Sequence, residues 1–94
     1  MCAYLKKRGW YDDCAVILSA DHGEQYGEGQ MILEHGTVHD SCIHIPMLLK
    51  LPGGAHRGEV CAHPVYGLDI APAAARFFAV AAPEMWHGTA LQDT

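Results

Sequence analysis

The residues best suited to chemistry are a carboxylate and an imidazole that adjoin each other, Asp21 and His22. They follow a continuous apolar run, residues 14–20, and Gly23 behind them allows the backbone to turn sharply. Carboxylate oxygens and imidazole nitrogens are both ligands of divalent metal ions. The pair therefore predicts a metal site at the end of a strand. An ordinary polar turn is the alternative that so short a motif leaves open.

A third residue, His35, stands before a glycine at the far end of a polar, glycine-rich stretch, residues 21–36. An imidazole in that place can return to the same site and donate a hydrogen bond to an anionic oxygen. The alternative is a solvated loop histidine. The other histidines indicate less: His39, His44, His56, His63 and His87. His44 and His63 lie in or beside expected strands, and His39 can form a local polar pair with Asp40.

The elements that position these residues follow from the apolar pattern. Residues 1–8 predict the end of a helix that Gly9 stops. Residues 14–20 predict a strand buried on both faces, as in a parallel sheet covered by helices. Residues 21–36 predict a long loop that leaves the carboxyl end of this strand, the edge at which open α/β sheets bind ligands.

The second half of the chain continues an α/β pattern. Residues 46–51 predict a second strand, closed by Pro-Gly-Gly, and residues 59–65 predict a short third strand. Asp69 is typical of a helix N-cap, with Pro72 in the first turn of the helix. Residues 79–94 predict an extended tail. Asp69 is therefore interpreted as a structural residue rather than a catalytic one.

Composition excludes several classes of protein. The 94 residues make one small domain at most, and a hydrophobic content of 50% with 18% charged residues is that of a globular chain. A net charge of −5 and a total of only six Lys and Arg residues argue against nucleic-acid binding. No apolar run approaches the roughly 20 residues of a membrane-spanning helix, and no signal peptide opens the chain. Nothing in the sequence indicates a compartment.

Four cysteines stand far apart and form no Cys-x-x-Cys pair: Cys2, Cys14, Cys42 and Cys61. This spacing argues against a structural zinc site and does not define a disulfide framework. The sequence predicts buried, unpaired thiols.

The order of the motifs SADHGE, YGEG, HG, IPMLLKLPGG, GLDIAPAAARFFAV and HGTAL resembles the C-terminal part of the sulfatases, a branch of the alkaline-phosphatase-like superfamily. The resemblance covers essentially the whole chain, residues 1–94. It implies an α/β fold in which this chain is an incomplete fragment of a sulfatase-like catalytic domain. The fragment would contribute part of a mixed sheet with flanking helices.

The resemblance also implies roles for the three candidate residues. Asp21 and His22 correspond to metal ligands, and His35 takes the place of a catalytic Lys or His that binds sulfate or phosphate oxygens. The implied cation is Ca²⁺ for a sulfatase, and Mn²⁺ or Zn²⁺ for a phosphoryl-transfer enzyme. The family nucleophile is a formylglycine made within Cys/Ser-x-Pro-x-Arg, and this chain contains no such motif. The nucleophile is therefore expected in the N-terminal half of the family's domain.

The resulting functional prediction is a fragment of a metal-dependent sulfuric-ester hydrolase that acts on a small-molecule sulfate or phosphate ester. A phosphodiesterase, phosphonate hydrolase or phosphoethanolamine transferase of the same superfamily is the first alternative. An inactive remnant or binding module is the second. The isolated chain is expected to be inactive and poorly stable, and to self-associate through an exposed sheet edge.

Overall fold

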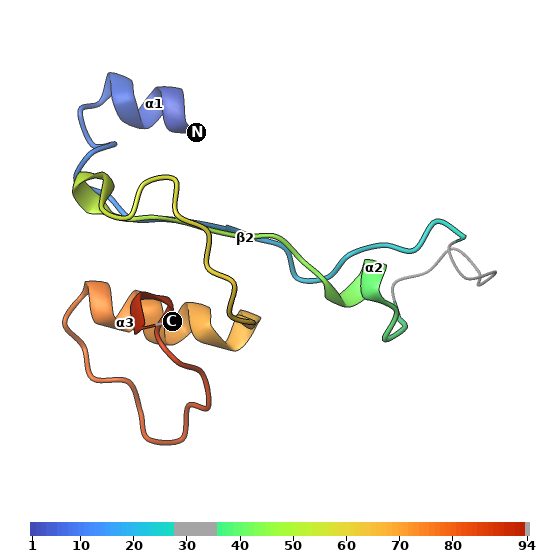
Figure 1. Cartoon of the computed structure of the whole chain (residues 1–94). Coiled ribbons are helices and arrows are strands. Elements are labelled where there is room, and N and C mark those ends of the chain that lie inside the picture. Colours follow the sequence, from blue (N-terminus) through green and yellow to red (C-terminus); the bar gives the residue numbers. More distant parts are fainter. Residues whose placement is uncertain (28–35, 94) are drawn as a thin grey trace. The chain divides into compact units, whose positions relative to one another are not determined.

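A computed structural model describes residues 1–27 and 36–93 of the chain (Figure 1). Its helices and strands are α1 (Cys2–Lys7), β1 (Val16–Ser19), α2 (Asp40–Ile43), β2 (Met47–Lys50) and α3 (Ile70–Phe77). Short 3-10 turns lie at η2 (Pro52–Gly54), η3 (Gly67–Asp69) and η4 (Leu91–Asp93). The chain divides into two compact units, one formed by Met1–Ile17 with Leu49–Thr94 and the other by Leu18–Leu48.

Helix α1 ends as its sequence predicts. Gly9 adopts a left-handed conformation with φ of +70°, which a glycine reaches without steric cost. Its amide donates to Lys6 across 3.0 Å, and the amide of Trp10 donates to Leu5, also across 3.0 Å. This pair of bonds is a Schellman motif, and it occupies carbonyl groups that the end of the helix leaves without a partner.

Strands β1 and β2 pair in a two-stranded sheet, so both of these predicted strands are confirmed. The carbonyl of Asp12, which precedes β1, accepts from the amide of Gly53, which follows β2, across 2.7 Å. The two strands therefore run antiparallel rather than parallel. The prediction of a strand buried on both faces is wrong for β1, because Leu18 keeps 47% of its surface exposed.

The third predicted strand, residues 59–65, is wrong. This segment is irregular, and its Val60 is 92% exposed. A strand needs a neighbour to accept its backbone hydrogen bonds, and the sheet of the described residues contains only β1 and β2. Val60, Cys61 and Ala62 are exposed instead.

Helix α3 begins where the sequence predicts, with Asp69 at its N-cap and Pro72 in its first turn. The Asp69 side chain makes no bond to the amides of α3. One carboxylate oxygen accepts from the amide of Tyr66 across 2.7 Å, and the other accepts from Thr89 across 2.8 Å. The buried carboxylate thus joins the turn before α3 to the C-terminal segment.

The core of the described residues is small. Its buried hydrophobic members are Cys42, Ala73 and Leu91. Many large apolar side chains are exposed, among them Trp10, Leu48, Val60, Leu68, Phe78, Met85 and Trp86. A soluble monomer seldom exposes so much large apolar surface. The architecture is consistent with a fragment of an alkaline-phosphatase-like domain.

Cys2, Cys14 and Cys61 carry free thiols, and of the four cysteines only Cys42 is buried. Cys2 and Cys61 are exposed, so the prediction of buried thiols is wrong for them. Cys2 lies at the start of α1 and Cys61 lies in the irregular segment, where no layer covers them. Within the described ranges, no helix combines the length and apolar character needed to cross a bilayer.

Candidate functional site

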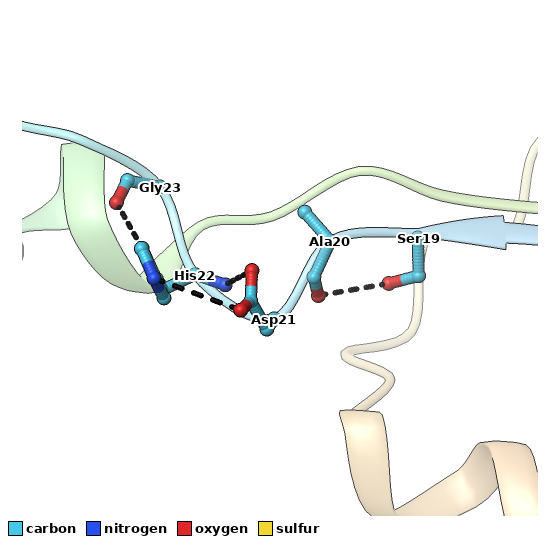
Figure 2. A network of polar contacts seen from close by, with 5 residues as sticks. All are labelled: Ser19, Ala20, Asp21, His22 and Gly23. Carbon is cyan, nitrogen blue, oxygen red and sulfur yellow. Dashed lines mark hydrogen bonds and ion pairs between the residues drawn. The ribbon is translucent and has the colours of Figure 1, made fainter.

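Asp21 and His22 lie just beyond the end of β1, where the chain leaves the sheet (Figure 2). The amide of His22 donates to Oδ1 of Asp21 across 3.0 Å. The other carboxylate oxygen, Oδ2, lies 3.7 Å from Nε2 of His22. The two side chains therefore face each other, as a pair of ligands to one ion would.

The ring of His22 is oriented by its own neighbour. Nδ1 lies 2.8 Å from the carbonyl oxygen of Gly23 (Figure 2). A carbonyl can only accept, so Nδ1 carries the hydrogen and the neutral ring presents its lone pair at Nε2. Metal-binding histidines are commonly fixed in this way by a hydrogen bond from the second ring nitrogen. Nε2 is also the nitrogen that faces Asp21.

The separation of the pair is close to that required by a shared ion. Two ligand atoms at roughly 2.1 Å from one cation, in tetrahedral or octahedral geometry, are roughly 3.0–3.5 Å apart. Oδ2 of Asp21 and Nε2 of His22 are 3.7 Å apart, so a small side-chain rotation reaches this range. The side chains are accessible, with 88% of Asp21 and 45% of His22 exposed.

Local electrostatics favour a positive charge at this position. The pKa of His22 is raised above its ordinary value, first because its ring bonds to the carbonyl of Gly23, and then because Asp21 is close. Glu24 adds a smaller effect in the same direction, and partial burial opposes the shift. A cation is attracted by the same groups, and it competes with the proton for Nε2.

Gly23 fixes the segment behind the pair. Its amide donates to the carbonyl of Cys42 in α2 across 2.7 Å. A Cβ atom at this position would lie 2.0 Å from the carbonyl oxygen of Ser41. Only glycine permits so close an approach to α2. The sequence indicated glycine here for a turn, whereas the structure assigns it to close packing.

As a metal site, the pair would supply two ligands, and a complete centre would need more. Among residues 1–27 and 36–93, no group of three or more His, Cys, Asp or Glu side chains could hold a metal ion. His35, the predicted anion-binding residue, lies outside the described residues.

Three of the remaining histidines have local partners: His39, His44 and His56. His39 caps α2 through Nδ1, which accepts from the amide of Ser41 across 3.2 Å. Asp40 lies 3.7 Å from His44 rather than pairing with His39. Nδ1 of His56 lies 2.9 Å from a carboxylate oxygen of Glu59, and both side chains are exposed. Histidine is an uncommon cap, so the sequence did not reveal α2.

Two residues near the pair were missed by sequence analysis, Gln25 and Thr37. Gln25 is fully buried, and its side-chain oxygen accepts from the hydroxyl of Thr37 across 3.3 Å. A glutamine within a polar, glycine-rich loop gives no signal of burial. Their contact depends on folding, which brings the two ends of the loop together.

Two hollows of the described surface lie in the other unit, with volumes of about 560 and 500 Å³. The first borders Arg76 and Asp93, and the second borders Cys14 and Phe77. Neither contains Asp21 or His22. With 88% of the Asp21 side chain exposed, the candidate site lies at an open segment end.

Comparison with known proteins finds similarity to a longer protein. The chain is 29% identical, over 90 residues, to the "Multifunctional alkaline phosphatase superfamily protein PehA" of Trinickia caryophylli. The alignment covers 95% of this chain but only 17% of that relative. No family model and no solved structure matches the chain. The similarity supports the alkaline phosphatase superfamily, and the sulfatase branch stays a prediction.

Proposed function

We propose that this chain is part of the catalytic domain of a metal-dependent ester hydrolase, to which it contributes Asp21 and His22 as ligands. The observation that carries the proposal is the geometry of the pair. Oδ2 of Asp21 faces Nε2 of His22 at 3.7 Å, while Nδ1 is held by the carbonyl of Gly23. The similarity to an alkaline phosphatase superfamily protein supports the same class of reaction.

The leading substrate class is a sulfuric ester, because the motif order resembles the sulfatase branch. A bound divalent cation would supply Lewis-acid polarisation of the ester oxygens. Asp21 provides negative charge, and the neutral ring of His22 provides the lone pair of Nε2. Gly23 keeps the ring in the tautomer that this requires. His35 is proposed to donate a hydrogen bond to the oxygen on which negative charge develops.

A second candidate is phosphoryl transfer within the same superfamily. Its specific support is the imidazole in the ligand pair, because nitrogen ligands suit Mn²⁺ or Zn²⁺ better than Ca²⁺, which prefers oxygen. The relative from Trinickia caryophylli is named as a multifunctional member of the alkaline phosphatase superfamily, to which both candidate reactions belong. A preference for Mn²⁺ or Zn²⁺ would favour this candidate, and a preference for Ca²⁺ would favour the sulfatase.

Metal binding is the first experiment. We would follow the ring signals of His22 by NMR while Mn²⁺, Zn²⁺ or Ca²⁺ is added to the chain. We expect selective broadening or shifts at His22, weakened at least tenfold in affinity by Asp21→Asn. Asp12→Asn, an exposed acid of the other unit, is the matched control. If the NMR signals of the His22 ring neither shift nor broaden with any of the three ions at millimolar concentration, the proposal is contradicted.

Turnover is the second experiment. The chain contains no Cys/Ser-x-Pro-x-Arg motif, so we expect a nucleophile from another part of the intact protein. An open reading frame that extends upstream and carries this motif would support the sulfatase. The extended protein would then be assayed with an aryl sulfate and an aryl phosphodiester, with Asp21→Ala as the inactive variant. Turnover that survives Asp21→Ala would contradict the assigned role.

A further inference from the structure

The ends of the glycine-rich loop are joined by a buried polar contact. Gln25, three residues after His22, has no solvent exposure. Its side-chain oxygen accepts from the hydroxyl of Thr37 across 3.3 Å. A buried amide is costly unless its polar atoms are bonded, so this contact has a strong reason to persist. It fixes the distance between the segment that leaves β1 and the segment that enters α2.

The hydroxyl of Thr37 is the centre of a small network. It accepts from the amide of His39 across 3.3 Å, and it lies 3.4 Å from the sulfur of Cys42. A hydroxyl has one hydrogen to donate, and an amide oxygen is a better acceptor than a thiol sulfur. Thr37 therefore donates to Gln25 and accepts from His39. Both hydrogen-bonding functions of the hydroxyl are used within the same unit of the chain.

The network continues through α2 to the metal-ligand pair. The carbonyl of His39 accepts from the amide of Cys42 across 2.8 Å. The carbonyl of Cys42 in turn accepts from the amide of Gly23 across 2.7 Å. Gly23 is the residue whose own carbonyl holds Nδ1 of His22. A continuous path of hydrogen bonds thus leads from Thr37 to the ring of His22.

We propose that Thr37 is a positioning residue for His22, acting through α2 and the backbone of Gly23. This inference rests on the proposed function, because the ring orientation matters only if Nε2 binds a metal ion. Thr37 itself touches neither ligand in the contacts that define this network. Its hydroxyl fixes the position of His39 at the start of α2. Helix α2 in turn fixes the position of the Cys42 carbonyl to which the amide of Gly23 is bonded.

Thr37→Val tests the proposal, because it replaces the hydroxyl with a methyl group of similar size. Loss of the hydroxyl leaves the buried oxygen of Gln25 and the amide of His39 without this partner. We expect Mn²⁺ or Zn²⁺ affinity to fall about tenfold, the lower end of the range for outer-shell partners of metal ligands. Thr37→Ser keeps the hydroxyl and should restore the affinity to within about twofold.

A spectroscopic measurement separates positioning from simple folding. The ¹⁵N shifts of the His22 ring report which nitrogen carries the hydrogen. We expect Thr37→Val to weaken the preference for hydrogen at Nδ1 and to speed amide exchange at Gly23 about fivefold, while Thr37→Ser preserves both. Thr89→Val makes the same chemical change at an exposed residue of the other unit and should alter neither.

The outcomes distinguish this proposal from the one on which it rests. If the unmodified chain binds no ion at His22, the proposed function fails, and the ring tautomer and Gly23 exchange still decide whether Thr37 positions the ring. If the chain binds metal and Thr37→Val binds it equally well, the positioning role is wrong. If Thr37→Val unfolds the whole unit, Thr37→Ser and Thr37→Ala decide: recovery by serine alone supports the hydroxyl, and recovery by both contradicts it.

Discussion

The amide of Gly23 is bonded to the carbonyl of Cys42 across 2.7 Å, which ties the candidate ligand segment to α2 by backbone alone. Asp21 and His22 are therefore held from both sides. Strand β1 ends two residues before Asp21, and the bond from Gly23 to Cys42 fixes the chain immediately after His22. A strand end by itself would leave the pair on a free loop.

Gly23→Ala should disrupt this attachment. The new Cβ atom would lie 2.0 Å from the carbonyl oxygen of Ser41, so α2 must move away. We expect the attachment of the Gly23 segment to α2 to lose about 1–3 kcal/mol of stability against local opening, as at other overpacked sites. Amide exchange at Gly23 and Cys42 measures it. Gly36→Ala is the matched control, because a Cβ there meets nothing within 4 Å.

Asp69→Asn should destabilise the other unit. The buried carboxylate accepts one backbone hydrogen bond on each oxygen, from Tyr66 and from Thr89. An asparagine offers one oxygen, so its NH₂ group would face one of these donors. We expect a cost of about 2–3 kcal/mol in the free energy of unfolding, measured by urea denaturation. Asp12→Asn, at an exposed position, should change it by less than about 0.5 kcal/mol.

The sequence predicted those parts of the fold that depend on neighbouring residues. The stop at Gly9, the first two strands and the start of α3 at Asp69 and Pro72 all follow from local patterns, and the structure confirms them. The third strand, residues 59–65, was wrong because apolar composition cannot reveal whether a partner strand is present.

The same distinction applies to the candidate site. Asp21 and His22 were found from residue type and from their place after an apolar run. The surroundings of the pair were not, because Gln25, Thr37 and Cys42 come together only through folding. Helix α2 was missed as well. With four residues it shows no helical period, and a histidine caps it.

Ala79→Gly should stabilise the end of α3. Ala79 adopts φ of +52°, the left-handed conformation that suits glycine in this place. The amide of Ala79 donates to Arg76 across 3.1 Å and that of Val80 donates to Ala75 across 2.9 Å, which repeats the motif at the end of α1. We expect a gain of about 0.5–1 kcal/mol, seen as a higher urea midpoint. Ala75→Gly, inside the helix, should instead cost at least about 1 kcal/mol.

Metal affinity at Asp21 and His22 should depend on pH in one direction. The pKa of His22 lies above the ordinary 6.5, because of the carbonyl of Gly23 and then the carboxylate of Asp21. A protonated ring cannot bind a cation, so affinity should rise as pH increases through this raised pKa and level off above it. Below that point, the competition of one proton lowers affinity about tenfold per pH unit.

The titration of the ring without metal checks the origin of this dependence. We expect the NMR midpoint of His22 to lie above 6.5 and to move toward lower pH in Asp21→Asn, because one of the groups that raise the pKa has been removed. Added salt should lower the midpoint in the unmodified chain and have less effect in the variant, since it screens the carboxylate. Asp12→Asn should leave the midpoint unchanged. A midpoint unaffected by Asp21→Asn would mean that the two side chains do not face each other in solution, and the shared metal site would then lose its geometric basis.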